Sequence, residues 1–248
     1  MKRVLLAGGF GKMGQAIQAQ LAQTEDLELV GILAPHPQAA DVPVFEKLVE
    51  IDVAADVWID VTTPSTVFEN VEFALAHGMD AVIGTSGLAE DELEALKQRA
   101  KQYTQHVLVV PNFSISAVLL MHFAEQAARY MPDAEVLEIH HQAKLDSPSG
   151  TAKATAQRIA KGRAAQPNLV GIGQASRGEA IEDVPVHAMR LPGYIAHEEV
   201  IFGATGESLH ISQDSISRDS FMAGVVLALR EVDQVPDLAV GLDTIMDF

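Results

Sequence analysis

The stretch Val4-Leu5-Leu6-Ala7-Gly8-Gly9-Phe10-Gly11-Lys12-Met13-Gly14 decides the fold class of this chain. Its apolar start, Val4–Ala7, predicts a buried strand, and the periodic pattern of Lys12–Gln23 predicts a helix directly after it. The glycines between them satisfy two spacings, G-x-G-x-x-G and G-x-x-G-x-x-G. Glycines at this place let backbone N–H groups approach a pyrophosphate at the helix N-terminus. The stretch therefore predicts a dinucleotide-binding loop, and the alternative is an ordinary glycine-rich turn.

Short apolar runs and helical patterns alternate through the first part of the chain, up to Pro111. Further strands are expected at 27–33, 57–62, 81–83 and 107–110, and helices at 64–77 and 89–103, with a short acidic helix before residue 57. Continuous apolar strands separated by helices indicate a parallel sheet covered on both faces. We therefore predict a Rossmann-type α/β domain here.

The pattern changes after Pro111. We expect a long apolar helix at 115–130, a strand at 136–140, a helix at 151–161, a loop at 162–183, strands at 184–190, 198–202 and 208–214, and a final helix at 220–232. These elements suit a smaller α+β domain with a mixed or antiparallel sheet. The prediction is a first domain of residues 1–113, completed by residues 220–248, and a second domain of residues 114–219.

The chain of 248 residues is strongly acidic, with 34 Asp and Glu against 17 Lys and Arg and a net charge of −17. Such a charge opposes binding to nucleic acid or to an anionic membrane surface. The absence of cysteine excludes disulfides, thiolate catalysis and cysteine-based zinc sites. No apolar stretch approaches the ~20 residues of a membrane span, and the N-terminus has no signal-peptide pattern. We expect a cytoplasmic protein with neither nucleic acid nor membrane as a partner.

The run from His140 to Ala152 gathers three potentially cationic side chains ahead of a Pro-Ser-Gly-Thr turn and an alanine-rich helical pattern. These side chains are His140, His141 and Lys144. Histidine donates a proton near neutral pH, and lysine holds a carboxylate and supplies positive charge to a reacting centre. Backbone N–H groups at the start of the helix offer a second anion-binding position, at Ser149, Gly150 and Thr151. The run predicts a site that binds a small dianion and gives it a proton.

Two other interpretations of this run stay open. The two histidines could be a surface pair, or core histidines with satisfied hydrogen bonds. A metal site is the other option, but zinc takes three or four convergent ligands and only distant residues could complete one. Those residues are His187, His197 and Glu198.

Two later loops fall at the carboxyl ends of parallel strands, where doubly wound sheets bind ligands. They are Gly84-Thr85-Ser86-Gly87 and Val110-Pro111-Asn112-Phe113-Ser114, and they are either nicotinamide contacts or plain turns. The second strand runs into Leu33-Ala34-Pro35-His36-Pro37, where a carboxylate would indicate NAD and an arginine NADP. Neither is present, although Lys12 and His36 could approach a ribose phosphate. The preference between NADH and NADPH is therefore left open.

These motifs, taken together, resemble those of the 4-hydroxy-tetrahydrodipicolinate reductase (dihydrodipicolinate reductase) family of bacterial lysine and diaminopimelate synthesis. The resemblance covers nearly the whole chain and rests on four matches in the family's order. The matches are Gly8–Gly14, Gly84-Thr85-Ser86, Pro111-Asn112-Phe113-Ser114, and Glu138-Ile139-His140-His141 continuing through Lys144 to Ala152. Near the C-terminus, Ser215-Ile216-Ser217-Arg218 and Phe221-Met222-Ala223-Gly224 resemble another family segment.

The resemblance implies an enzyme that transfers hydride from NADH or NADPH to C4 of a cyclic imine dicarboxylate, with loss of hydroxide and delivery of a proton to the ring. It implies that His140 is the proton donor, that Lys144 assists protonation and binds substrate, and that His141, Gly150 and Thr151 hold the carboxylates. It also implies a homotetramer joined through sheets of the second domain. From the residues themselves we expect no metal. The dinucleotide contacts that the resemblance implies are Gly8, Gly9, Phe10, Gly11, Lys12, Met13, Gly84, Thr85, Ser86, Val110, Pro111, Asn112 and Phe113.

The chain departs from the family pattern at three places. Ala34 and Pro35 stand where a charged residue is usual, which bears on nucleotide preference. His197 is displaced by one position and follows Ala196 instead of glycine, which bears on any role of His197. The segment Asp60-Val61-Thr62 lacks the usual aromatic residue. The alternatives are another dinucleotide-dependent oxidoreductase of a small dicarboxylate, and a non-catalytic dinucleotide sensor.

Overall fold

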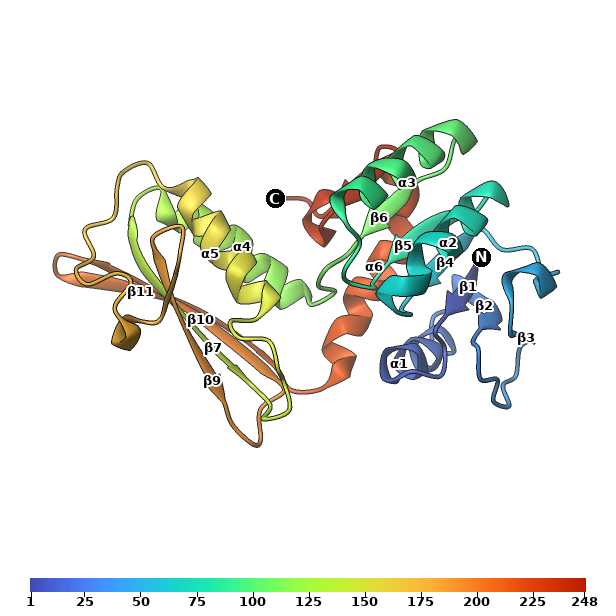
Figure 1. The fold of residues 1–248 in the computed structure, drawn as a ribbon, viewed down its shortest axis with the longest axis horizontal. Coiled ribbons are helices and arrows are strands. Elements are labelled where there is room, and N and C mark those ends of the chain that lie inside the picture. Colours follow the sequence, from blue (N-terminus) through green and yellow to red (C-terminus); the bar gives the residue numbers. More distant parts are fainter. The chain divides into compact units, whose positions relative to one another are not determined.

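Residues 1–248 are described by a computed structural model, in which the chain forms two units (Figure 1). The first unit comprises Met1–Phe113 and Phe221–Phe248, and the second comprises Ser114–Ser220. The C-terminal segment thus returns to the unit in which the chain begins. No helix has the length and apolar character that crossing a membrane requires.

The first unit is built on a seven-stranded sheet in the order β12-β6-β5-β4-β1-β2-β3, and every neighbouring pair is parallel. Its strands are β1 (Lys2–Ala7), β2 (Leu27–Leu33), β3 (Val44–Phe45), β4 (Val57–Asp60), β5 (Asp80–Ile83), β6 (Val107–Val109) and β12 (Leu238–Val240). Its α-helices are α1 (Lys12–Leu21), α2 (Pro64–Ala76), α3 (Glu90–Tyr103) and α6 (Met222–Glu231). Short 3₁₀ turns lie at Leu48–Glu50 (η1), Val232–Gln234 (η4) and Leu242–Ile245 (η5).

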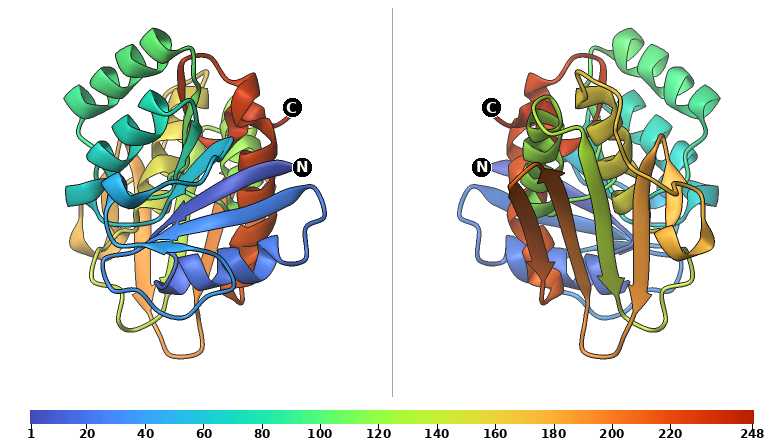
Figure 2. Two further views of the ribbon diagram at one scale, coloured as in Figure 1. Left: turned by 90° about the vertical axis from the view of Figure 1, so that its right-hand side faces the viewer. Right: turned by 90° about the vertical axis from the view of Figure 1, so that its left-hand side faces the viewer.

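Helices cover both faces of this sheet, which is why its strands are apolar at successive positions. The helices α2 and α3 lie on one face, and α1 and α6, which contact each other, lie on the other (Figure 2). All four residues of β4 are buried, including Trp58, and Leu5 and Leu6 of β1 are both fully buried although they point to opposite faces. The predicted Rossmann-type α/β fold is confirmed.

The strand order also locates the ligand-binding edge of the first unit. The chain runs outward from β1 through β2 and β3, and then continues with β4 on the other side of β1. Doubly wound sheets bind ligands at such a switch point, outside the carboxyl ends of the strands. The glycine loop after β1 and the segment Val61–Thr63 after β4 both lie at this edge.

Two strands of the first unit, β3 and β12, were not predicted. They have two and three residues, which is too short for apolar alternation to identify them, and they form the two edges of the sheet. The expected acidic helix before residue 57 is a 3₁₀ turn of three residues, with the carboxylate of Glu50 accepting the N–H of Lys47 at 3.3 Å.

The second unit has a five-stranded mixed sheet in the order β11-β10-β7-β9-β8. The strands β7 and β9 are parallel, and the other pairs are antiparallel. Its elements are α4 (Ile115–Ala128), β7 (Asp133–His140), α5 (Gly150–Gly162), η2 (Ala175–Arg177), β8 (Glu179–Ile181), β9 (Val184–Arg190), β10 (Ala196–Ala204), β11 (Glu207–Ser215) and η3 (Arg218–Phe221). Both α4 and α5 pack on one face of this sheet, and no α-helix covers the opposite face (Figure 2).

The prediction of an unstructured loop over residues 162–183 was partly wrong. The segment contains η2 and the edge strand β8, which pairs antiparallel with β9 through a tight turn. Glu182 and Asp183 form that turn with φ of 48° and 60°. Because β8 is short and largely exposed, its sequence has no apolar alternation to reveal it.

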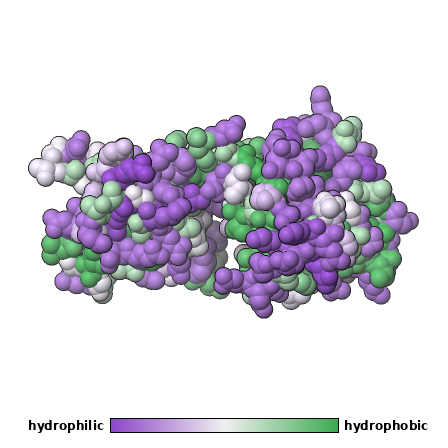
Figure 3. Space-filling view, turned by 90° about the horizontal axis from the view of Figure 1, so that it is seen from above, coloured by the Kyte–Doolittle hydropathy of each residue, from purple (hydrophilic) through white to green (hydrophobic).

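Hydrophilic residues cover most of the surface that Figure 3 shows, in both units. This agrees with a composition in which Asp and Glu outnumber Lys and Arg two to one. The apolar residues that remain exposed include Met189, Leu191, Tyr194 and Leu209, which lie on or beside the sheet of the second unit.

Candidate active site

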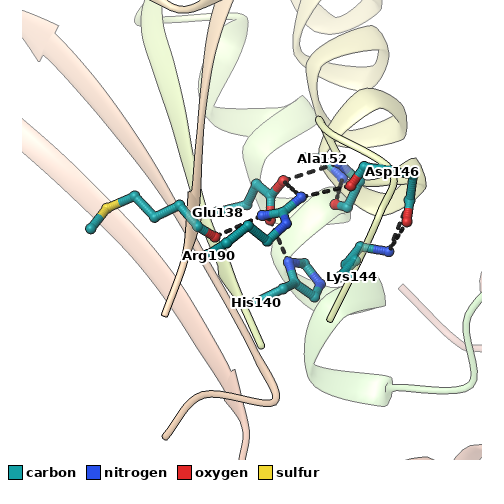
Figure 4. A network of polar contacts seen from close by, with 8 residues as sticks. Glu138, His140, Lys144, Asp146, Ala152 and Arg190 are labelled. Carbon is teal, nitrogen blue, oxygen red and sulfur yellow. Dashed lines mark hydrogen bonds and ion pairs between the residues drawn. The ribbon is translucent and has the colours of Figure 1, made fainter. Parts of the chain in front are cut away.

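The strand β7 places Glu138 and His140 side by side at its carboxyl end. Residues two apart in a strand point to the same face, and here that face is covered by helices. Glu138 is fully buried, and Nδ1 of His140 is hydrogen bonded to Oε2 of Glu138 (Figure 4). The imidazole of His140 is largely buried, with 14% of its side chain exposed. A buried carboxylate therefore lies directly behind the imidazole that the sequence identifies as the proton donor.

Arg190, at the end of β9, binds the same carboxylate with both terminal nitrogens. Its Nη1 is 2.9 Å from Oε2 of Glu138 and its Nη2 is 2.9 Å from Oε1. The pairing of β7 with β9 sets this geometry, because His140 and Arg190 are partners in the parallel register. Such two-point pairs of guanidinium and carboxylate are among the stronger hydrogen bonds in proteins.

Glu138 and Arg190 also hold the segment that follows His140. The N–H of Ser149 donates to Oε1 of Glu138 at 3.1 Å, and Nη2 of Arg190 donates to the carbonyl of Asp146 at 2.7 Å. Burial raises the pKa of Glu138, but the hydrogen bonds from His140, Arg190 and Ser149 outweigh it and hold that pKa below its ordinary value. Glu138 is therefore an anion at neutral pH.

Lys144 lies in a turn closed by its own N–H, which donates to the carbonyl of His141 at 3.1 Å. Its Nζ is 2.8 Å from both carboxylate oxygens of Asp146 (Figure 4). The hydrogen bond from Lys144 lowers the pKa of Asp146. His140 ends β7, and Lys144 lies on the irregular segment after it, so the two residues do not share a helix face.

The helix α5 begins at Gly150, and Ser149 caps it by accepting the N–H of Ala152 at 3.1 Å. Because the N–H of Ser149 donates to Glu138, the interpretation of that N–H as a ligand-binding group is wrong. Gly150 is exposed, and a Cβ there would meet no atom within 4 Å. The backbone at Gly150 thus borders open space, which leaves room for a ligand group close to it.

All five predicted catalytic and substrate-binding residues lie on the one segment between the end of β7 and the first turn of α5. Sequence reasoning missed their supporting residues Glu138, Asp146 and Arg190 as parts of the site. A signal for Glu138 existed, because it lies two residues before His140 in a predicted strand. Arg190 had no such signal, since the pairing of β7 with β9 is not visible in the sequence.

The distant residues considered as metal ligands have other partners. Nε2 of His187 is 2.7 Å from Oε2 of Glu135, and Nδ1 of His197 is 2.9 Å from Oδ1 of Asp214. Glu198 accepts a hydrogen bond from Oγ1 of Thr155. No group of three or more His, Asp or Glu residues has a metal-binding arrangement.

In the first unit, the glycine loop follows β1 in a conformation that needs glycine. Gly8 has a φ of 84°, and a Cβ there would lie 2.6 Å from the carbonyl oxygen of Val61. At Gly14, a Cβ would lie 2.3 Å from the carbonyl oxygen of Gly8. The helix α1 begins after Gly11 with no side-chain cap. This is the close backbone packing that a pyrophosphate-binding loop requires.

A cavity of about 760 Å³ borders this loop. Gly8, Phe10 and Gly11 line it on one side, and the end of β2, residues 46–49 and residues 61–63 complete it. Lys47, a cation that the sequence did not single out, also lines it. A cavity of this size at a switch point has the dimensions of a small-molecule site.

Asp60, at the end of β4, holds the neighbouring loops. Its buried carboxylate accepts hydrogen bonds from the N–H of Thr62 at 3.1 Å, Nδ2 of Asn70 at 2.9 Å and Oγ1 of Thr85 at 2.8 Å. The loop after β5 is packed as closely as the glycine loop, because a Cβ at Gly84 would lie 2.6 Å from the ring of Phe113. The sequence singled out Asp60 only as part of the segment Asp60-Val61-Thr62, and its role in joining these loops emerges from the structure.

The two units match the two domain models of one family. The model described as dihydrodipicolinate reductase, N-terminus, matches residues 2–113, and the model described as dihydrodipicolinate reductase, C-terminus, matches residues 116–246. This chain belongs to the dihydrodipicolinate reductase family. The family predicted from the motifs is therefore confirmed.

Relatives named 4-hydroxy-tetrahydrodipicolinate reductase are similar to this family member over nearly its whole length. The protein from Lactobacillus acidophilus is 46% identical over 257 residues, which cover 99% of this chain and 98% of the relative. The one from Lactiplantibacillus plantarum is 44% identical over 263 residues, which cover 99% of this chain and all of the relative. The predicted enzyme class, a pyridine-nucleotide-dependent reductase of lysine and diaminopimelate biosynthesis, is confirmed.

Solved structures agree with this family assignment. Dihydrodipicolinate reductase from Paenisporosarcina sp. TG-14, a structure with dipicolinate bound, has a TM-score of 0.88 and 39% identity, and the match covers 99% of this chain and 100% of that one. A scyllo-inositol dehydrogenase from Lactobacillus casei has a TM-score of 0.65 at 12% identity, over 99% of this chain and 92% of that one. The second likeness shows a shared fold alone.

Proposed function

We propose that this dihydrodipicolinate reductase family member converts 4-hydroxy-tetrahydrodipicolinate to tetrahydrodipicolinate, with oxidation of NADH or NADPH and loss of water. The observation that carries the proposal is the His140 imidazole, backed by a buried carboxylate, on the same short segment as Lys144 and the open backbone of Gly150. Such a segment suits a substrate with two carboxylates that must also receive a proton. The dipicolinate bound to the similar enzyme from Paenisporosarcina supports a small dicarboxylate.

In this proposal His140 delivers the proton and Lys144 binds a substrate carboxylate. Lys144 is paired with Asp146, and in this proposal the substrate carboxylate replaces Asp146 as its partner. The positive charge of Lys144 then lies near the reacting ring and stabilises the electrons that the hydride adds. The backbone and side chains of His141, Gly150 and Thr151 bind the carboxylates.

The first unit would hold the dinucleotide, which supplies the hydride. The cavity beside Gly8 and the close backbone packing at Gly8 and Gly14 fit a pyrophosphate and its attached ribose. We propose Gly8, Gly9, Phe10, Gly11, Lys12 and Met13 as contacts from the loop after β1. Further proposed contacts are Gly84, Thr85, Ser86, Val110, Pro111, Asn112 and Phe113, from the carboxyl ends of β5 and β6.

Both NADH and NADPH are proposed as cofactors. The cavity brings His36 and Lys47 to the end of β2, together with the carboxylate of Glu46. The carboxylate of Glu46 suits the ribose 2′-hydroxyl of NADH, and the two cationic side chains suit the 2′-phosphate of NADPH. Charge alone therefore favours neither nucleotide. A comparison of KM for the two nucleotides measures the preference.

The second unit is proposed to bind substrate and to form a homotetramer. The face of its sheet without α-helices, to which the exposed Met189 belongs as the cross-strand partner of Ile139, is the surface available for such an interface. The molecular mass in solution, relative to the 26.6 kDa chain, measures the number of subunits.

The test of the proposed function is an assay in which the substrate is generated in place by the aldolase reaction that forms it. Oxidation of NADH or NADPH is followed by the loss of the near-ultraviolet absorbance of the reduced nicotinamide. We expect turnover by the native chain and a drop in kcat of about 10²–10³ for His140→Ala, the range for loss of a general acid. Absence of nucleotide oxidation with both cofactors would contradict the proposal.

A further inference from the structure

Glu138 receives hydrogen bonds from three separate parts of the second unit. They come from His140 on its own strand, from the guanidinium of Arg190 on β9, and from the N–H of Ser149 before α5. No part of Glu138 is exposed to solvent. A buried carboxylate is costly unless it is paired and hydrogen bonded, and Arg190 supplies the opposite charge.

The contact with Glu138 determines which nitrogen of His140 carries hydrogen. An ionised carboxylate only accepts hydrogen bonds, so Nδ1 of the imidazole must donate. The other ring nitrogen, Nε2, is then the atom left to hold and release a proton toward substrate. Without the carboxylate, the imidazole could rotate or exchange its tautomer, and either change would remove the proton from the reacting position.

We propose that Glu138 is a positioning residue of this reduction, which fixes His140 in the Nδ1–H tautomer and, with Arg190 and Ser149, fixes the segment that carries Lys144. It touches neither substrate nor cofactor in this role. The inference rests on the proposed function for its kinetic consequence, whereas its structural part, the tautomer of His140, holds whichever dicarboxylate is reduced.

The charged groups around Glu138 include a second buried carboxyl group. Glu198 on β10 is the cross-strand partner of Glu138, is 2% exposed, and is hydrogen bonded to Thr155 of α5. Burial raises the pKa of Glu198 to about 7. The ionisable groups that face Glu138 are therefore His140 on β7, Arg190 on β9 and Glu198 on β10. Since Arg190 and His140 both bind Glu138, the negative charge of the pair resides on Glu138.

Glu198 provides a matched control for Glu138. The two residues have the same side chain, are almost equally buried and lie directly opposite each other on neighbouring strands. Only Glu138 is hydrogen bonded to His140. Replacing each by glutamine removes one buried carboxyl group at nearly constant volume, so a difference between the two variants reports on the contact with His140.

The kinetic experiment compares kcat and KM of Glu138→Gln with those of Glu198→Gln. We expect Glu138→Gln to lower kcat by about 10- to 100-fold, the range for residues that orient a functional histidine, with the KM for the dinucleotide unchanged. Glu138→Asp should recover part of kcat, and Glu198→Gln should keep kcat within about twofold of the native enzyme. Equal losses of kcat in both glutamine variants, with no recovery in Glu138→Asp, would overturn the proposal.

The second experiment needs no turnover. Nitrogen NMR of the native protein with labelled histidine, at a pH where His140 is neutral, reports the tautomer directly; the signals are assigned by their loss in His140→Asn. We expect His140 to be protonated at Nδ1. Protonation at Nε2 would overturn the proposal even if Glu138→Gln failed to fold. An inactive native enzyme with the expected tautomer would instead count against the proposed function alone.

Discussion

At the residue scale, the candidate acid and the candidate binding lysine have carboxylate partners of different kinds. His140 is hydrogen bonded to the fully buried Glu138, whereas Lys144 pairs with Asp146, whose side chain is mostly exposed. Because the carboxylate of Asp146 is mostly exposed, water competes with Lys144 for it, and the pair contributes little to stability. A substrate can therefore take Lys144 from Asp146 at small cost, while His140 keeps its orientation.

Lys144→Ala should damage binding and chemistry together, since Lys144 both holds a substrate carboxylate and places charge near the reacting ring. We expect kcat to fall by about 10²-fold and the KM for the substrate to rise by about 10-fold. Lys161→Ala is the control, because Lys161 is also ion paired but lies at the end of α5, with Glu125 as its partner. An unchanged KM in Lys144→Ala would contradict the binding role.

Glu198→Gln should change how stability depends on pH. Burial raises the pKa of Glu198 to about 7 from an ordinary value of 4.5, so the folded chain keeps a proton that the unfolded chain loses between these values. The free energy of unfolding therefore decreases as pH rises through this window, by on the order of 3 kcal/mol, and is constant with respect to this group above it.

Glutamine cannot ionise, so the unfolding free energy of Glu198→Gln should not fall in this way as pH rises. Urea denaturation of both proteins at about pH 5 and about pH 8 measures the effect. We expect the stability of the native chain relative to Glu198→Gln to be lower at the higher pH. A pH-independent difference would show that Glu198 is ionised in the folded chain throughout.

At the element scale, the sequence predicted most strands and helices but not their pairing. The strands at Leu27–Leu33 and Val184–Arg190 have the predicted bounds, because each is an apolar or alternating run with clear turn residues on either side. The short edge strands β3, β8 and β12 have too few residues for a pattern. The same difference applies to the site. His140 and Lys144 were predicted because they lie in one continuous motif. The contact of Glu138 with Arg190 was not, because it depends on the pairing of two strands about fifty residues apart in the chain.

The loop between β1 and α1 offers a test at this scale. In Gly8→Ala the new Cβ would lie 2.6 Å from the carbonyl oxygen of Val61, and the residue would keep a φ of 84°. The loop must therefore shift, and we expect the KM for the dinucleotide to rise by about 10-fold or more. We also expect the free energy of unfolding to fall by about 1–3 kcal/mol.

Gly206→Ala separates conformational strain from displacement of the loop. Gly206 also has a φ of 84°, but a Cβ there would meet no atom within 4 Å. We expect a similar backbone penalty and an unchanged KM for the dinucleotide. Equal KM values in Gly8→Ala and the native enzyme, measured by steady-state kinetics, would show that this loop does not bind the dinucleotide.

At the scale of the whole molecule, a chain of net charge −17 is proposed to act on a dianion. The global field opposes such a substrate, so the cations gathered at the end of β7 must attract it locally. They are His140 and Lys144, both recognisable from the sequence motif, whereas the charge of Arg190 is paired with the buried Glu138. The C-terminal segment returns to the first unit, where β12 pairs with β6 and completes the seven-stranded sheet.

The most direct test of the proposed reaction follows the hydride itself. NADH or NADPH carrying deuterium at the transferable position of the nicotinamide is supplied with 4-hydroxy-tetrahydrodipicolinate, and the product is analysed by mass spectrometry and NMR. The account predicts tetrahydrodipicolinate with one deuterium at C4 and without the hydroxyl group. A product that retains the hydroxyl group, or that carries no deuterium at C4, would contradict it.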